Sequence, residues 1–243
     1  MFRVVIPARY ASTRLPGKAL IEIAGKPMIQ WVYERSRASR ASEVIVATDD
    51  ARIVEAARRF GASVEMTSPT HQSGTDRIAE VARAKGWRNT DVIVNVQGDE
   101  PLMPHALIDQ VAGLLLDNAD AGMATLASPL GRIEELLDPN IVKVVADGQG
   151  RALYFSRAPI PWDRDNRQTF AQGRRHVGIY AYRVGALLKL AALAPTPLEQ
   201  LEKLEQLRAL ENGIGIRVAN AVVKPGADVN TKEDLERAAA ALR

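Results

Sequence analysis

Short apolar runs rich in β-branched residues alternate with helical patterns through the first hundred residues of this 243-residue chain. The apolar runs cover residues 4–6, 43–48, 63–66 and 91–96, and the helical patterns between them cover residues 27–39, 51–60 and 75–85. Parallel strands need a crossover connection, which is usually a helix and is almost always right-handed. The alternation therefore predicts an α/β fold with a doubly wound, mostly parallel sheet, whose ligands bind beyond the carboxyl ends of the strands.

The second half of the chain departs from strict alternation. Residues 141–147 and 152–157, joined through Gly148-Gln149-Gly150, predict a β-hairpin. Other patterns predict strands over residues 122–128, 176–182 and 214–220, and helices over residues 104–116, 184–193 and 198–210 and after Thr231. We expect a single domain over residues 1–243, in which about residues 141–182 form an insertion of the kind that often pairs with a second subunit.

The composition limits the classes of function. There is no cysteine, so disulfides, thiolate zinc sites and thiol nucleophiles are excluded, and a reducing compartment fits. The chain begins without the apolar core of a signal peptide, and no apolar run approaches the ~20 residues of a membrane span, so we expect a soluble, cytoplasmic protein. The net charge is +3, the basic residues are dispersed and aromatics make up 5%, which argues against nucleic-acid binding.

The loop after the first apolar run contains three cationic side chains among small residues. Arg9, Arg14 and Lys18 could bring their charges and several backbone N–H groups onto a polyphosphate. Gly17-Lys18 is followed by Ala19, with no glycine five positions before Gly17, so the loop is not a Walker A motif. The alternative is a solvated basic connector between a strand and a helix.

A carboxylate follows the strongest predicted strand. Asp99 lies in a glycine-containing turn directly after residues 91–96. Because Mg²⁺ takes one or two protein carboxylates together with phosphate oxygens and water, Asp99 and an oxygen from residues 228–230 would suffice to hold it with a nucleotide. An aspartate that only accepts hydrogen bonds from turn N–H groups is the alternative. The cationic loop and the two acidic loops together favour nucleotidyl transfer.

Eight segments in a consistent order along the chain resemble the 3-deoxy-manno-octulosonate cytidylyltransferase family. They read IPARYASTRLPGK, ATDD, HQSGTDR, VNVQGDEP, NIVKVV, ALYFSRAPIPWDRD, HVGIYAYR and LEKLEQLRALE. The resemblance implies a nucleotidyltransferase-type α/β fold and the reaction of CTP with 3-deoxy-D-manno-octulosonate (Kdo) to give CMP-Kdo and diphosphate. It also implies a Mg²⁺ requirement, a homodimer, a sugar-binding role for the insertion and service to lipopolysaccharide biosynthesis.

The resemblance also assigns roles to residues. It implies catalytic roles for Arg9, Lys18 and Asp99, and nucleotide contacts from Ala8, Arg9, Arg14, Lys18, Gln72, Ser73, Gly74 and Arg77. It implies contacts with the sugar acid from Gln97, Arg157, His176, Tyr182, Glu205 and Gln206. On the residues alone, His176 could equally be a core histidine and Glu205 a solvated helix residue.

The sequence departs from the family near its C-terminus. Where the family usually has a second metal-binding aspartate, this chain has Asn230, so the metal site could be Asp99 with Asn230 or Asp99 with Asp228. The interval between Asp165 and His176 is also short for the family, which leaves open a related 2-keto sugar acid such as 8-amino-Kdo or a sialic-type sugar. A glycosyltransferase would need a D-x-D motif that Asp49-Asp50 and Asp99-Glu100 do not provide, and a non-catalytic nucleotide-binding regulator would not need Asp99 and the three cations.

Overall fold

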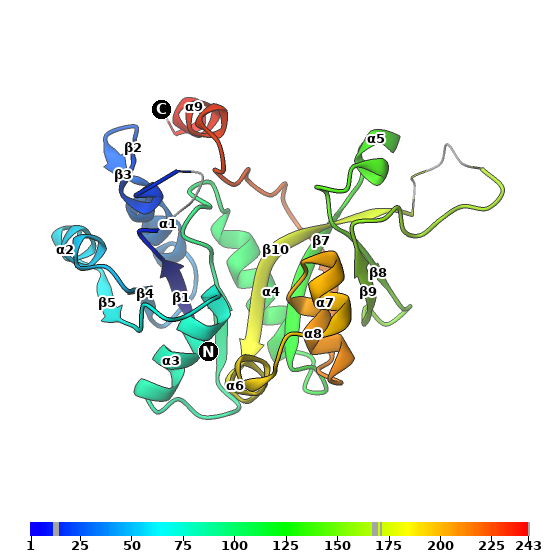
Figure 1. Cartoon of the computed structure of the whole chain (residues 1–243), viewed down its shortest axis with the longest axis horizontal. Helices are drawn as coiled ribbons and strands as arrows, with labels where there is room; N and C mark the ends of the chain where they lie inside the picture. Colours follow the sequence, from blue (N-terminus) through cyan, green and yellow to red (C-terminus); the bar gives the residue numbers. More distant parts are fainter. Residues whose placement is uncertain (12–14, 167–169, 171, 243) are drawn as a thin grey trace.

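The computed structural model describes residues 1–11, 15–166, 170 and 172–242, and is organised around one mixed sheet (Figure 1). The strands on its main path lie in the order β11 (Ile216–Asn220), β7 (Met123–Pro129), β10 (Arg174–Arg183), β6 (Val92–Asn95), β1 (Phe2–Ala8), β4 (Val44–Thr48) and β5 (Ser63–Met66). The pairs β6–β1, β1–β4, β4–β5 and β11–β7 are parallel. The predicted α/β fold with a mostly parallel sheet is confirmed.

One strand of the central sheet runs against the others. β10 lies between β6 and β7 and pairs antiparallel with both. Its register with β6 places Tyr182 opposite Ile93, and its register with β7 shifts between Val177 and Tyr180. β10 therefore carries residues from the second half of the chain to the edge of the parallel sheet where β1 and β6 end.

Helices cover both faces of the sheet, because successive strand side chains point to opposite faces. Val4 and Ile6 of β1 pack in a core with α1, α2 and α4, whereas Val5 packs in a second core with α3, α6 and α8. The bounds are α1 (Met28–Arg37), α2 (Ala51–Arg59), α3 (Gly74–Ala84), α4 (His105–Leu116), α6 (Val184–Ala192) and α8 (Gln206–Glu211). The strands β1, β4 and β6 between these two cores are almost completely buried, which explains their continuous apolar runs.

A smaller unit projects from the sheet beside β10, at the right of Figure 1. It contains α5 (Ile133–Leu137) and the antiparallel strands β8 (Lys143–Ala146) and β9 (Ala152–Ser156). β8 joins the main sheet through the pairing of Lys143 with Arg175 of β10. β8 and β9 fall within the insertion predicted over residues 141–182, whereas β10, which ends that range, is a strand of the main sheet.

The helix predicted over residues 198–210 is wrong in one respect, because the chain forms two short helices there. α7 (Pro197–Glu202) ends at Lys203, which has a left-handed φ of 55°, and α8 follows after Leu204. The bend lets Arg208 of α8 fold back and donate Nε to Glu199 of α7 at 2.7 Å. This buried ion pair depends on a side-chain contact that the leucine spacing does not encode.

The remaining short elements surround the carboxyl ends of β1 and β6. They are the 3₁₀ helix η1 (Lys18–Leu20), the strands β2 (Glu22–Ile23) and β3 (Lys26–Pro27), and the terminal helix α9 (Lys232–Ala241). Val229, just before α9, is 1% exposed and packs in a small core with Ile23, Met28 and Ala238. The C-terminal loop is thereby held against the same edge of the sheet as η1.

Candidate active site

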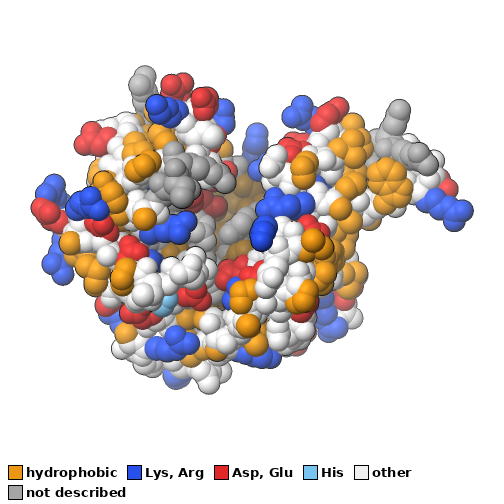
Figure 2. Space-filling view, viewed as in Figure 1, with side chains coloured by type: hydrophobic (Ala, Val, Ile, Leu, Met, Phe, Trp, Pro, Cys, Tyr) orange, Lys and Arg blue, Asp and Glu red, His pale blue; other side chains and the backbone are white. Residues whose placement is uncertain are grey.

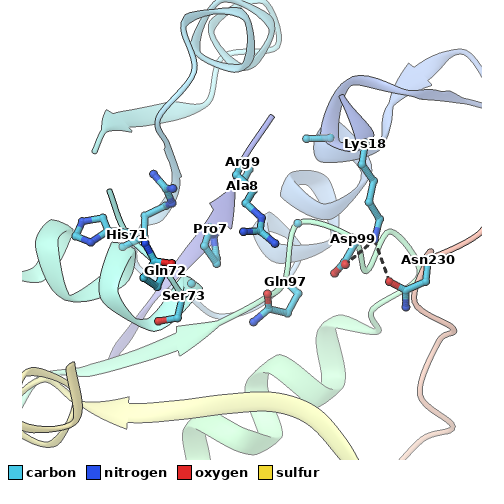
Figure 3. Close-up of a pocket in the computed structure, with 14 residues that line it drawn as sticks. Pro7, Ala8, Arg9, Lys18, His71, Gln72, Ser73, Gln97, Asp99 and Asn230 are labelled. Carbon is cyan, nitrogen blue, oxygen red and sulfur yellow. Dashed lines mark hydrogen bonds and ion pairs between the residues drawn. The ribbon is translucent and has the colours of Figure 1, made fainter. Parts of the chain in front are cut away.

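A polar cavity of about 360 Å³ lies at the carboxyl ends of β1 and β6. The surface is hollowed at the centre of the face in Figure 2, with acidic and basic side chains along the hollow. Ten of the residues predicted for the site line the cavity: Ala8, Arg9, Lys18, Gln72, Ser73, Gly74, Arg77, Gln97, Asp99 and Asn230. The structure thus brings together four segments that are far apart in the sequence (Figure 3).

Two glycines allow these segments to approach β1 closely. A Cβ atom on Gly98 would lie 2.9 Å from the backbone oxygen of Pro7, and a Cβ atom on Gly74 would lie 3.1 Å from the Pro7 ring. Real Cβ atoms are not found as close to backbone as 2.9 Å, so only glycine fits at position 98 without a shift of the chain. These contacts place the turn after β6 and the start of α3 on either side of the end of β1.

The Gln72-Ser73-Gly74 turn is the N-terminus of α3. Ser73 Oγ accepts a hydrogen bond from the Asp76 N–H at 3.1 Å, and Asp76 Oδ2 accepts one from the Ser73 N–H at 3.2 Å, which forms a capping box. His71 Nε2 contacts Glu80 of the same helix. Because a helix N-terminus presents N–H groups and a partial positive charge, this wall of the cavity suits an electron-rich ligand.

The opposite wall contains a lysine between two oxygens. Lys18 reaches from η1 and donates from Nζ to Asp99 Oδ2 at 2.7 Å and to Asn230 Oδ1 at 3.2 Å (Figure 3). The Lys18 side chain is 13% exposed and that of Asp99 is 35% exposed. The backbone oxygen of Asp99 also accepts from the Val229 N–H at 2.9 Å, which ties the C-terminal loop to this turn.

The two alternatives for the second metal-binding position are distinguished by their contacts. Asn230 lines the cavity and directs its amide oxygen toward Lys18, whereas the exposed Asp228 accepts a hydrogen bond from Nδ2 of Asn230. Among the residues that the structure describes, no cluster of three or more histidine, aspartate or glutamate side chains is arranged to hold a metal ion. One carboxylate and one amide oxygen could therefore hold Mg²⁺ only together with oxygens of a bound ligand and water.

Glu100, next to Asp99, lies in an environment that disfavours its charge. Burial, and then the nearby carboxylates of Asp99 and Asp228, raise the pKa of Glu100 to about 8. Its Oε2 atom is buried and accepts no hydrogen bond from the described part of the chain. The side chain is therefore mostly neutral at pH 7, and Asp99 is the carboxylate that balances Lys18.

Arg77 is positioned by a residue that the sequence interpretation did not select. Arg77 is 3% exposed, donates from Nη2 to Asp49 Oδ2 at 2.7 Å and contacts the Thr67 hydroxyl through Nη1. Its guanidinium thus supports the cavity wall while it is paired with Asp49. The signal was present in the sequence, because Asp49 directly follows a buried strand and Asp99 lies in the turn after another.

The predicted sugar-side residues Arg157, His176, Tyr182, Glu205 and Gln206 lie outside the lining of this cavity, as far as the described residues define it. Polar contacts nevertheless connect them to it. Gln97 Nε2 donates to Asn95 Oδ1 at 3.2 Å, and the side chains of Asn95 and Thr75 lie near the Tyr182 hydroxyl, where they oppose the rise in its pKa that burial causes. Thr75 Oγ1 donates to Glu205 Oε2 at 2.8 Å, so a row of polar side chains extends from the cavity to the start of α8.

His176 is partly buried and lies among aromatic rings. Its ring lies 5.1 Å from that of Phe155 and 5.3 Å from that of Tyr180, and its Nε2 is 3.0 Å from Thr125 Oγ1. Burial lowers the pKa of His176 to about 3, so the imidazole is neutral at physiological pH. It can serve there as a hydrogen-bonding group and not as a cation.

The other residues predicted on the sugar side differ in their burial and in their hydrogen bonds. Burial raises the pKa of Glu205, and Gln206 is 8% exposed at the start of α8. Arg157 donates from Nε to the backbone oxygen of Glu202 at 2.7 Å and from Nη1 to that of Pro139 at 2.9 Å. Arg14 lies outside the residues that the structure describes.

Comparison with known proteins identifies relatives along the whole chain. The sequence model of the cytidylyltransferase family matches residues 3–218. A 3-deoxy-manno-octulosonate cytidylyltransferase of Thioalkalivibrio sulfidiphilus is 53% identical over 247 residues, covering 100% of this chain and 99% of that protein. The enzyme of the same name from Pseudomonas fluorescens is 56% identical over 243 residues, covering 97% of this chain and 96% of that protein.

Solved structures agree with the sequence comparisons. A structure described as CMP:2-keto-3-deoxy-manno-octonic acid synthetase complexed with CTP superposes with a TM-score of 0.92 at 42% identity, covering 99% of this chain and 97% of that one. A cytidylyltransferase from Leptospira borgpetersenii, at 21% identity and a TM-score of 0.62, shares the fold. In the described part of the chain, every helix is too short or too polar to cross a bilayer.

Proposed function

The chain belongs to the 3-deoxy-manno-octulosonate cytidylyltransferase family, and from this premise we propose that it converts CTP and Kdo into CMP-Kdo and diphosphate. The observation that carries the proposal is the cavity at the ends of β1 and β6, which combines Arg9, Lys18, Asp99 and the N-terminal turn of α3. A protein of the same fold over 99% of this chain is described as complexed with CTP.

The reaction requires charge neutralisation and alignment of two anions. The anomeric hydroxyl of the sugar acid must attack the α-phosphorus in line with the departing diphosphate. We assign Arg9 and Lys18 to the triphosphate, because both line the cavity and both have basic side chains that can pair with phosphate oxygens. We assign the turn of Gln72, Ser73 and Gly74 to the cytosine, where main-chain groups can bind the edge of the base. Arg14 completes this assignment as a further phosphate contact.

Mg²⁺ is part of the proposal, and the residues present fit it. Asp99 and Asn230 direct oxygens at one cation already, the ammonium of Lys18, so the two oxygens converge on a single position. Asp99 and Asn230 would hold Mg²⁺ together with phosphate oxygens. When bound, the metal supplies neutralisation of the triphosphate and acidifies a nearby hydroxyl. Lys18 is then free to turn toward the phosphates.

We assign the sugar acid to the side of the site beyond Gln97. The polar side chains from Gln97 and Asn95 past Tyr182 and Thr75 to Glu205 supply donors and acceptors suited to a polyhydroxylated ligand. Arg157, which directly follows β9, supplies a cation that suits the carboxylate, and the neutral His176 and the buried Gln206 suit hydroxyl groups. The insertion over about residues 141–182 then forms the sugar side of the site.

We further propose a homodimer that acts in the cytoplasm in lipopolysaccharide biosynthesis. Apolar side chains are exposed on α5, β9 and α7, where Leu137, Leu153 and Leu201 are 54%, 61% and 81% exposed. Exposed apolar side chains near the β8–β9 unit support pairing with a second copy through the insertion. Sedimentation at two concentrations tests the dimer, and monomeric behaviour at micromolar concentration would contradict it.

Pyrophosphate release measured with each of the four NTPs, with and without Kdo, tests the proposed activity. We expect release only with CTP, Kdo and Mg²⁺ together. An acceptor panel containing 8-amino-Kdo and a sialic acid tests the sugar, since the interval between Asp165 and His176 is short for the family. Release without any acceptor, or equal release with all four NTPs, would contradict the proposal.

A further inference from the structure

We propose that Asp228 is a positioning residue that orients the side-chain amide of Asn230, so that its oxygen faces the metal position beside Asp99. This inference rests on the proposed function, because it concerns the same Mg²⁺ site. Its starting point is that Asn230 uses both ends of its amide: Nδ2 donates to Asp228 Oδ2, and Oδ1 accepts from Lys18 Nζ at 3.2 Å.

The chemistry of an amide makes its orientation matter. The oxygen of an asparagine side chain carries lone pairs that can bind a cation, whereas the NH₂ group has donors only. The two ends are similar in size, so packing alone distinguishes them poorly. If the Asn230 amide turned over, an NH₂ group would face the Lys18 ammonium and the metal position, and the site would lose one of its two protein oxygens.

Asp228 provides what is needed to select one orientation. An ionised carboxylate only accepts hydrogen bonds, so it can be satisfied by the NH₂ end of Asn230 and not by the oxygen end. Lys18 acts in the same sense from the other side, because an ammonium only donates. The amide therefore lies between a pure acceptor and a pure donor. Once phosphates draw Lys18 away, the Asp228 carboxylate would continue to favour the orientation in which the oxygen faces the metal position.

The backbone around Asn230 is held by contacts that do not involve the Asp228 side chain. The Val229 N–H donates to the Asp99 backbone oxygen at 2.9 Å, and the Asn230 N–H donates to Asp234 Oδ2 at 2.8 Å. Val229 is buried in the small core under α9, and Gly226 packs directly against the backbone of Leu102. Loss of the Asp228 carboxylate should therefore free the amide without displacing the loop.

The proposal also gives a physical reason for the departure of this chain from the usual family pattern. An aspartate at position 230 would present two equivalent oxygens and would need no orienting partner. An asparagine needs one, and Asp228, two residues earlier on the exposed side of the loop, supplies it. Partners that orient a metal ligand typically change metal affinity ~10–100-fold when removed.

A Mn²⁺ titration followed by electron paramagnetic resonance, with CTP present and the sugar acid omitted, tests the proposal without turnover. The signal from a solution of Mn²⁺ and CTP alone is subtracted. We expect Asp228→Ala to weaken Mn²⁺ binding ~10–100-fold relative to the wild type. Glu236→Ala is the matched control, because it removes one carboxylate from the exposed side of α9 and should leave the affinity unchanged.

The decisive arm is Asn230→Asp. In this background there is no amide to orient, so adding Asp228→Ala should restore Mn²⁺ affinity at least to the wild-type value. Thermal unfolding without metal checks folding, and Asp228→Asn, which has the same shape but can also donate, should weaken binding as Asp228→Ala does.

Two outcomes would overturn the inference. One is wild-type Mn²⁺ affinity in Asp228→Ala and Asp228→Asn. The other is an equal loss when Asp228→Ala is made in the wild type and in the Asn230→Asp background, which would make Asp228 itself the ligand. Failure of the proposed function is a separate result: the wild type would then release no pyrophosphate with CTP and Kdo, whatever the metal titration shows.

Discussion

The buried ammonium group of Lys143 supports both the stability of the fold and the arrangement of the sugar side of the site. Lys143 is 0% exposed and donates to the backbone oxygens of Asp138, Ile141 and Arg157 at 2.8, 2.6 and 2.7 Å. Burial lowers the pKa of Lys143, and nearby Asp138 and Glu202 oppose that shift. The side chain joins the segment before β8 to the end of β9, where Arg157 lies.

The perturbation is Lys143→Met, which keeps the length of the side chain and removes its donors. All three carbonyls lose a charged partner, but the Asp138 oxygen keeps another donor, the Ile141 N–H at 3.2 Å, so the cost falls mainly on the other two. A buried polar group left unsatisfied costs ~1–3 kcal/mol. Part of that cost is recovered, because a lysine ammonium no longer has to be desolvated and the methionine side chain is apolar. We expect the free energy of unfolding to fall by ~2–4 kcal/mol.

The assay is urea unfolding at pH 7.5, with Lys189→Met as the matched control. Lys189 is exposed and donates to one backbone oxygen, that of Asn212, at 3.1 Å, so its replacement should change stability by less than ~0.5 kcal/mol. Because the Arg157 oxygen is one of the three acceptors, Lys143→Met should also raise the KM for Kdo more than the KM for CTP. Unchanged stability, or equal effects on the two KM values, would refute this reasoning.

Three further predictions concern the cavity and His176. Asp99→Asn should fold normally but lower turnover at least ~10²-fold, because a metal-borne electrostatic stabilisation is lost; near-normal turnover at saturating Mg²⁺ would contradict the assignment. Lys18→Met should raise the KM for CTP. It should also tighten the binding of Mn²⁺ without nucleotide, because the ammonium no longer occupies the space between Asp99 and Asn230. Weaker Mn²⁺ binding in a calorimetric titration would argue against this assignment. The pKa of His176 falls from 6.5 to about 3 on folding, so below pH 6.5 the unfolded chain takes up a proton that the folded chain does not, and stability is lost as the pH drops. We expect urea titrations to show that the unfolding free energy falls by ~2 kcal/mol less in His176→Phe than in the wild type when the pH is lowered from 7.5 to 5. Equal falls in the two proteins would contradict a neutral His176.

The meeting of the Arg9 loop and Asp99 could be predicted from the sequence. Both segments follow apolar runs of parallel strands, and the carboxyl ends of such strands lie at one edge of the sheet. The structure places β1 beside β6, and the residues after each strand line one cavity. Here local periodicity and the rules of chain connection are sufficient, because they determine strand direction together.

The antiparallel placement of β10 could not be predicted in the same way. An apolar strand has the same two-residue period whether its neighbours run parallel or antiparallel, so its direction depends on contacts with distant segments. The break of the predicted helix at Lys203 has a similar origin, because it is compensated by the ion pair between Arg208 and Glu199. The pairing of Arg77 with Asp49 likewise joins residues whose separation in space the sequence pattern does not specify.

The choice between Asn230 and Asp228 shows where side-chain detail becomes necessary. The sequence identifies the loop and its oxygen-bearing residues, but both side chains are close enough along the chain to reach the turn at Asp99. The hydrogen bond between the two, and the contact from Lys18, assign them different positions relative to the cavity. The arrangement of donors and acceptors shows that Asn230 faces the cavity and that Asp228 lies behind it.

The product of the reaction provides the most direct test of the proposed cytidylyl transfer. The enzyme is incubated with CTP, Kdo and Mg²⁺, and the mixture is followed by ³¹P nuclear magnetic resonance. We predict that the three CTP signals are replaced by one phosphodiester signal, from CMP joined to the sugar acid, and by diphosphate in equal amount. Formation of CDP and inorganic phosphate, or of free CMP in place of the phosphodiester, would contradict cytidylyl transfer to the sugar acid.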